Sequence, residues 1–96
     1  MKTEQEQKEF YERLKKELEE TSQWPSTYLY KFIIPNDTEK KHTLEAIFEG
    51  KKADIKTRTS SNGKYTSVSI SILLQNPDEV IAYYREAGKI EGILSL

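Results

Sequence analysis

The feature that most constrains this chain is a tight turn followed by a long alternation of small polar and aliphatic residues, SSNGKYTSVSISILL at residues 60–74. Asn62 and Gly63 tolerate the positive φ angles of a two-residue type I′ turn, so we predict that turn between two strands. The turn fixes a register in which Thr57 faces Val68. Because a slip of one residue would send every side chain to the other face, this register decides what the hairpin buries.

The register gives the two hairpin strands, residues 54–61 and 64–74, one aliphatic and one polar face. The aliphatic face comprises Ile55, Thr57, Val68, Ile70, Ile72 and Leu74. The polar face comprises Lys56, Arg58, Ser60, Tyr65, Ser67, Ser69 and Ser71. We expect helices to cover the aliphatic face and the polar face to stay uncovered.

Before the hairpin, residues 3–20 predict an amphipathic helix whose narrow apolar stripe comprises Phe10, Leu14 and Leu18. The dipeptide Trp24-Pro25 ends this segment, because the residue before a proline favours extended geometry. We therefore divide the chain into an N-terminal amphipathic helix and linker, residues 1–23, and a domain formed by residues 24–96.

The domain begins with an alternating segment, TYLYKFII at residues 27–34, which predicts a strand. One of its faces presents Tyr28, Tyr30, Phe32 and Ile34, and the other presents Leu29, Lys31 and Ile33. Asn36, followed three residues later by Glu39, predicts a capping box that opens a helix over residues 36–50.

After the hairpin, Asn76 and Pro77 predict the start of a second helix, since asparagine caps well and proline suits the first helical position. Gly88 ends this helix. Residues 89–96 predict a last strand whose two faces are unequal. One face presents Ile90, Leu94 and Leu96, and the other presents Ile93.

The order of these elements predicts an α+β fold, the ferredoxin-like βαββαβ sandwich, with an extra N-terminal helix. Right-handed crossovers place the strands of the four-stranded antiparallel sheet in the order 4-1-3-2, with two helices on one face. The uncovered face then also receives Leu29, Lys31, Ile33 and Ile93. Its apolar half would be a liability in water or a binding surface.

Composition excludes several classes of function. The chain has 96 residues, enough for one domain, and a formal net charge of −1, which is too balanced for a nucleic-acid or membrane-surface footprint. It has no cysteine and no apolar run long enough to span a membrane, so we expect a cytoplasmic protein. No metal or cofactor is expected: His42 is the sole histidine, and it lies among charged residues on a predicted helix face.

Three segments carry a family resemblance: YKF at residues 30–32, SSNGKYTSVSI at residues 60–70 and YREAGKIEGILSL at residues 84–96. They resemble the YbeD-like family of small bacterial proteins, a family of unknown function. The resemblance covers the chain after the first helix. It implies a fold akin to the ACT domains that sense small molecules, and a regulatory role, with no established active site to carry over. The added N-terminal helix and a shorter first core helix depart from the family.

Two places are candidate sites for a regulatory or binding function. By analogy with ACT domains, a small metabolite would bind the loop formed by Pro35, Asn36, Asp37 and Thr38. The alternative is a protein-interaction adaptor that uses the open sheet face and the first helix. That speculative surface comprises Lys31, Lys56, Arg58, Tyr65, Ser67, Ser69 and Ser71.

Other functions fit the residues less well. The hairpin residues Ser60, Ser61, Gly63 and Lys64 could hold an anion, but a good turn explains them. An acylphosphatase-like enzyme would need an arginine and backbone amides in the loop after the first strand, which reads Ile-Pro-Asn-Asp. An RNA-binding sheet would need aromatic residues where this chain has serines. We therefore expect no catalytic residues.

The apolar stripe of the first helix needs a partner, because such a helix is marginal alone. The candidates are the open sheet face, a second copy of the helix, or another protein. We favour the open face of the same or a neighbouring subunit, and we expect a homodimer.

Overall fold

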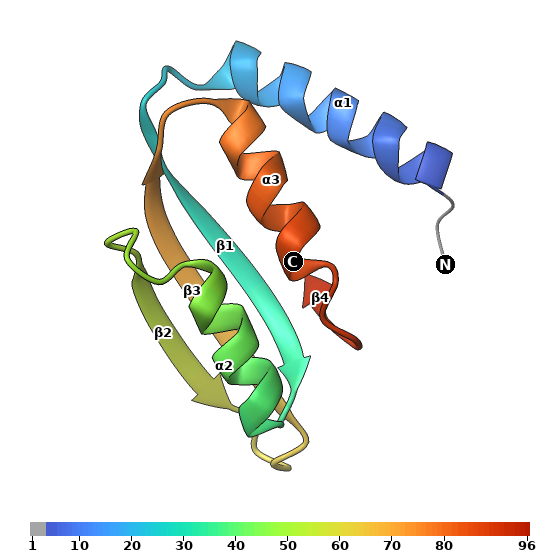
Figure 1. The fold of residues 1–96 in the computed structure, drawn as a ribbon, viewed down its shortest axis with the longest axis vertical. Helices are drawn as coiled ribbons and strands as arrows, with labels where there is room; N and C mark the ends of the chain where they lie inside the picture. The colour runs from blue at the N-terminus through green and yellow to red at the C-terminus, as the bar shows by residue number, and fades with distance from the viewer. Residues whose placement is uncertain (1–3) are drawn as a thin grey trace.

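The computed structural model describes residues 4–96, so residues 1–3 of the predicted N-terminal segment lie outside the described residues. The elements along the chain are α1 (Glu4–Thr21), β1 (Ser26–Pro35), α2 (Thr38–Ile47), β2 (Asp54–Thr59), β3 (Tyr65–Leu74), α3 (Pro77–Ala87) and β4 (Leu94–Ser95). The strands form one 4-stranded antiparallel sheet in the order β2-β3-β1-β4, which is the predicted order read from the opposite edge. Figure 1 shows α2 and α3 on one face of this sheet. The predicted ferredoxin-like α+β fold is confirmed.

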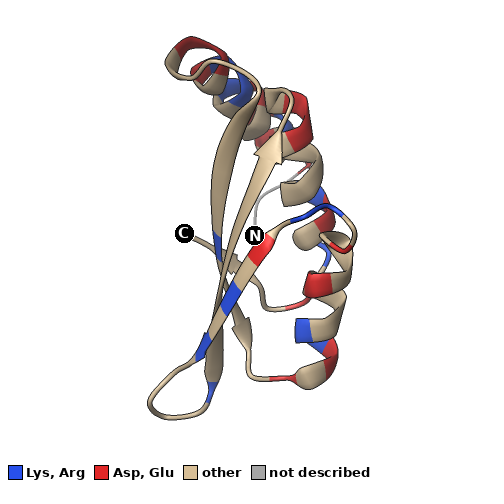
Figure 2. Cartoon of the chain, turned by 90° about the vertical axis from the view of Figure 1, so that its left-hand side faces the viewer, with Lys and Arg blue, Asp and Glu red and all other residues tan. Residues whose placement is uncertain are grey.

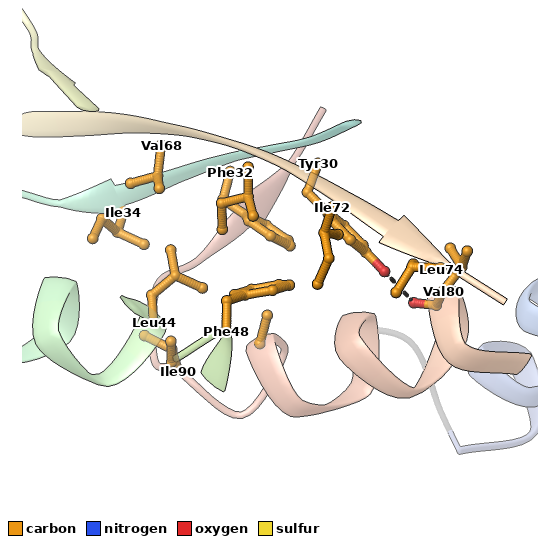
Figure 3. Packing of buried hydrophobic residues seen from close by; sticks show 12 residues of the cluster. Tyr30, Phe32, Ile34, Leu44, Phe48, Val68, Ile72, Leu74, Val80 and Ile90 are labelled. Carbon is orange, nitrogen blue, oxygen red and sulfur yellow. Dashed lines mark hydrogen bonds between the residues drawn. The ribbon is translucent and has the colours of Figure 1, made fainter. Parts of the chain in front are cut away.

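The core lies between this face of the sheet and the two helices (Figure 3). Tyr30 at the centre of β1 is fully buried, and its hydroxyl donates a hydrogen bond to the carbonyl oxygen of Val80, 2.9 Å away. Burial raises the pKa of Tyr30 well above its ordinary value. The ring of Phe48 stacks on Tyr83 with 4.7 Å between centroids. Aromatic residues from β1, from the C-cap of α2 and from α3 therefore join the sheet to both helices.

The predicted hairpin register is confirmed, with Thr57 opposite Val68. The predicted type I′ turn is wrong. Such a turn needs positive φ angles at both central residues, and within the loop only Gly63 has one, of 73°. Asn62 keeps a negative φ.

A four-residue loop, residues 61–64, closes the hairpin instead. The amide of Gly63 donates to the carbonyl oxygen of Ser60 at 2.9 Å. The Asn62 side-chain oxygen accepts hydrogen bonds from the Ser60 hydroxyl at 2.8 Å and from the Lys64 amide at 3.0 Å. These local bonds give Asn62 a turn-forming role that needs no left-handed backbone. The wider loop preserves the predicted register because Ser60 stays opposite Tyr65, with the Ser60 amide donating to the Tyr65 carbonyl oxygen at 2.8 Å.

The helix caps were predicted with mixed success. The start of α3 is confirmed: the Asn76 side-chain oxygen accepts from the amide of Glu79 at 3.0 Å. The cap of α2 was placed one residue too early, because Asp37 is the N-cap and its carboxylate accepts from the Lys40 amide at 3.1 Å. Asn36 makes other contacts, described below. The helix also ends earlier than predicted, at Ile47.

Helix α1 packs against α3, beside which it lies in Figure 1. The Lys15 ammonium lies 3.0 Å from the Asp78 carboxylate. The guanidinium of Arg85 lies over the ring of Tyr11, 4.8 Å from its centroid. The expectation that α1 covers the open face of its own subunit is therefore wrong. Within the stripe, Leu18 packs against the core, and Phe10 and Leu14 line a groove with Tyr84 of α3.

The last strand is much shorter than predicted, since β4 contains only Leu94–Ser95. Gly92 has a φ angle of 81°, which turns the chain before the strand begins. The turn reverses the predicted faces. Ile93 packs against the core, whereas Leu94 lies opposite Ile33 on the open face and is 58% exposed. Leu96 follows on the same face and is 76% exposed, and its amide donates to the carbonyl oxygen of Lys31 at 2.9 Å.

Candidate functional site

The open sheet face, the face opposite α2 and α3, has a polar centre built around β3. Lys31 of β1 and Lys56 of β2 lie on either side of Ser69, and Arg58 lies beside Ser67. Adjacent strands are about 4.8 Å apart, so both lysines reach over the serine row from opposite sides. The hairpin register and the β1–β3 pairing together bring these residues to one place.

This polar centre contains a shallow depression of about 310 Å³. The open-face residues that line it are Lys31, Lys56, Arg58, Ser67, Ser69 and Leu96. Within residues 4–96, the hydroxyls of Ser67, Ser69 and Ser71 have no protein hydrogen-bond partner, although the last two side chains are half-buried. Three cations and two such hydroxyls therefore converge on a space that could hold an acidic group.

Charge is unevenly distributed between the two sides of the molecule. Figure 2 shows lysine and arginine along the strands and most of the acidic residues on the helices. The strands carry Lys31, Lys56 and Arg58 against a single acid, Asp54 at the start of β2. The formal net charge of −1 for the whole chain does not reveal this local excess of positive charge. A local field of this kind attracts acidic groups.

Apolar side chains border the polar centre. On the open face the exposed fractions are 49% for Leu29, 58% for Leu94, 60% for Leu73 and 76% for Leu96. Ile33 is half-buried between them. Tyr65, at the first position of β3, is 48% exposed. Sequence reasoning missed Leu94 and Leu96, which it assigned to the covered face, and wrongly included Ile93. The signal that could have found them is Gly92, which marks a break in the alternation.

The loop predicted to bind a small molecule has a structural role. The Asn36 amide group donates to the carbonyl oxygen of Gly63 at 2.9 Å, and its oxygen accepts from the Thr66 hydroxyl at 3.2 Å. Asp37 caps α2, where Thr38 is the first residue. Pro35 is the last residue of β1 and pairs with Tyr65. The loop therefore joins β1 to the hairpin, and its ligand-binding role stays a prediction.

The remaining polar residues form no further reactive centre among residues 4–96. Within that range no group of three histidine, cysteine or acidic side chains could hold a metal ion. His42 lies on α2, in a surface groove with Glu45 and Glu49, on the opposite side of the sheet from the serines. Tyr84 packs in the core, where its hydroxyl lies 2.7 Å from that of Tyr28. Burial raises the pKa of Tyr84 above its ordinary value.

The fold and this surface define a small α+β protein with a ferredoxin-like core and one uncovered sheet face. The chain belongs to the family described as Protein of unknown function (DUF493), whose model matches residues 19–96. The predicted resemblance to YbeD-like proteins is thereby confirmed. Within residues 4–96, no helix has the length and apolar character that crossing a membrane requires.

Similar proteins support the same assignment. UPF0250 proteins from two strains of Haemophilus influenzae, PittEE and PittGG, are each 47% identical over 38 residues, a stretch that spans 40% of this chain and 41% of theirs. The solution structure of protein HP0495 from H. pylori is 21% identical, with a TM-score of 0.68 over 79% of this chain and 86% of that one. At this identity, the likeness to HP0495 shows the fold alone.

Proposed function

We propose that this protein is a regulatory binding domain, not an enzyme, and that its open sheet face selects an acidic ligand. The observation that carries the proposal is the convergence of Lys31, Lys56 and Arg58 on one depression with serine hydroxyls that have no hydrogen-bond partner among residues 4–96. Hydrogen bonds and ion pairs to a carboxylate or phosphate would satisfy these groups together.

The chemistry of the face supports binding over catalysis. A serine acts as a nucleophile only when a base lies within hydrogen-bond reach to take its proton. Ser67 and Ser69 have lysines and an arginine beside them, which donate hydrogen bonds and accept none, and His42 lies on the other side of the sheet. The one carboxylate of the face, Asp54, pairs with Ser71 and does not line the depression. The depression therefore offers positive charge and hydrogen-bond donors without a base beside its serines.

The same geometry favours the open face over the loop at Pro35 and Asn36 as the place where a ligand binds. The side chains of Asn36 and Asp37 already hold the hairpin and α2, so a ligand there would have to displace those bonds. The open face has no such internal use. A small metabolite and an acidic protein are both ligands of the proposed kind.

The expected homodimer has to use another surface. If two open faces met, the three cations of one subunit would lie against those of the other, with only Asp54 of each copy to offset them. Like charges held in contact oppose association. Light scattering should therefore give the same molecular mass for the wild type and for a variant whose face cations are neutralised.

A titration with an unstructured acidic peptide tests the proposed function. We expect a deca-glutamate peptide to shift the backbone amide resonances of β1, β2 and β3, and we expect added salt to weaken the effect. A variant with Lys31→Gln, Lys56→Gln and Arg58→Gln should lose these shifts. The matched control, Lys16→Gln with Lys51→Gln, removes exposed cations from α1 and from the turn after α2 and should retain them. Equal binding by the two variants would refute the proposal.

A further inference from the structure

The open face is divided lengthwise by β3. On one side, β2 presents Asp54, Lys56 and Arg58, all exposed. On the other side, β1 and β4 present mainly apolar residues: Leu29, Ile33, Leu94 and Leu96, with Lys31 among them. The boundary between the charged and apolar sides follows the strand direction. A ligand that matches both sides has its own charged and apolar surfaces side by side along its length.

The floor between the two sides is low and narrow. Ser67, Ser69 and Ser71 follow one another along β3, and each has longer side chains beside it on both neighbouring strands. The larger Tyr65 and Leu73 lie at the two ends of the row. Small residues at an interface let a second backbone approach closely, as they do between packed helices.

The dimensions of the open face fit one helix. The 10 residues of β3 extend about 33 Å at 3.3 Å per residue, the length of a helix of about 22 residues, and the serine floor of this trough, from Ser67 to Ser71, takes up about 13 Å at the centre. The outer strands lie about 14 Å apart where the two-residue β4 is present and about 10 Å apart elsewhere, close to the 10–12 Å diameter of a helix with its side chains. An extended peptide would instead add to a free edge such as that of β2.

We propose that the open face binds one acidic amphipathic helix of another protein, with its axis along β3. Its acidic side faces Lys56 and Arg58 of β2, and its apolar side covers the exposed leucines of β1 and β4. This inference rests on the proposed function, because it names the class of acidic ligand that the cations select. The area available, roughly 300–500 Å² from these dimensions, is typical of a transient complex.

Two other occupants fit the surface less well. A nucleic acid would match the cations but would leave the leucines covered by phosphate and sugar, and it would find serines where bases stack on aromatic rings. A second copy of this chain would offer its acidic helix α1, but only Phe10 of the apolar stripe is exposed, at 43%, whereas Leu14 and Leu18 are half-buried within their own subunit. Charge complementarity and the exposed leucines therefore favour a separate protein.

Three synthetic peptides of 22 residues test the inference by fluorescence anisotropy. The first is an amphipathic helix with leucines on one side and glutamates beside them. The second has the same composition in an order that abolishes the amphipathic pattern. The third replaces each glutamate with lysine. We expect the first to bind at least 10-fold more tightly than either of the others, since it alone matches both sides of the trough.

Variants of the full chain assign the contacts. The pair Lys56→Glu and Arg58→Glu should weaken binding of the first peptide at least 10-fold and should favour the lysine peptide. The pair Leu29→Asn and Leu94→Asn should weaken it several-fold, whereas Lys16→Glu with Lys51→Glu should change it less than twofold. Circular dichroism checks that each variant is folded. The peptide comparison in the wild-type protein does not depend on any variant.

The outcomes separate this inference from the proposed function. If the scrambled peptide binds as tightly as the helix, and both depend on the cations, the helix is refuted while acidic selection stands. If neither the cations nor the leucines affect binding, both proposals fail. Light scattering on the protein alone gives a last outcome. Self-association that Lys56→Glu with Arg58→Glu abolishes would place a second copy in the trough and overturn the assignment to another protein.

Discussion

Replacing Asn36 with alanine should destabilise the protein although Asn36 is exposed. Its side chain joins β1 to the hairpin by a bond to the carbonyl oxygen of Gly63 and a bond from the hydroxyl of Thr66. Thr66 is only 5% exposed, and Asn36 is its one side-chain partner within residues 4–96. The substitution therefore removes two hydrogen bonds and leaves a buried hydroxyl without an acceptor.

The magnitude follows from these two bonds. Each contributes about 0.5–1.5 kcal/mol net, so Asn36→Ala should lower the free energy of unfolding by about 1–3 kcal/mol. At about 4–8 °C per kcal/mol for a domain of this size, a loss of about 2 kcal/mol lowers Tm by about 8–16 °C. Thr66→Val alone should cost about 1 kcal/mol. In the Asn36→Ala background, Thr66→Val should lower the free energy of unfolding by almost nothing, because the Thr66 hydroxyl that it removes has already lost its acceptor.

Urea unfolding followed by circular dichroism measures all four members of this double-mutant cycle. We expect a coupling energy of about 1 kcal/mol between Asn36 and Thr66. Asp37→Ala is the matched control: it should cost about 0.5–2 kcal/mol through the cap of α2, and it should add independently to Thr66→Val. A cost below about 0.5 kcal/mol for Asn36→Ala, or additivity with Thr66→Val, would refute the reasoning.

Two further predictions concern the core and the turns. Because the pKa values of Tyr30 and Tyr84 are raised, the folded protein holds these protons more tightly than the unfolded chain. The contribution of these two tyrosines to the free energy of unfolding should be fully present below about pH 10 and should decrease above it. In urea titrations, Tyr30→Phe should reduce the difference in stability between pH 8 and pH 10.5. At pH 7 the same substitution should lower the free energy of unfolding by about 1 kcal/mol. Gly92→Ala should cost more than Gly50→Ala in thermal unfolding. Both have positive φ, 81° and 75°, but only at Gly92 would the new Cβ lie 3.0 Å from Pro35; equal losses would contradict this reading.

The sheet could be predicted from the sequence because its information is local. Alternation in residues 27–34 and in the hairpin shows which side chains share a face. Once one pair such as Thr57 and Val68 is placed, every other pair of the hairpin follows, and this register does not depend on the turn type. The cap of α2 could not be predicted in the same way, because Asn36 and Asp37 are both good capping residues. The choice between them is made by Gly63, 27 positions from Asn36 in the chain.

The candidate site was predicted in part for the same reason. Its cations and serines follow from the hairpin register and from the alternation of β1. Its apolar border did not follow, because alternation carried through Gly92 gives Leu94 the wrong face. The position of α1 also depends on contacts that the sequence does not specify: its narrow stripe fits any apolar surface, and Asp78 and Arg85 of α3 provide specific partners.

The serine row distinguishes a surface suited to binding from one suited to folding. Serine has a weaker preference for strands than threonine, whose branched side chain packs well on a pleated sheet. If stability alone set these positions, threonine would serve better at Ser69, which lies between two paired strands and whose hydroxyl has no partner in the described part of the chain. We therefore expect Ser69→Thr to raise the free energy of unfolding by a few tenths of a kcal/mol, up to about 1 kcal/mol.

The same change should weaken binding of the amphipathic peptide several-fold, because the added methyl group keeps the helix from the floor of the trough. Unfolding and anisotropy measured on one preparation would decide the matter, and a variant that gained stability and kept its affinity would show that close approach is not what the serines provide.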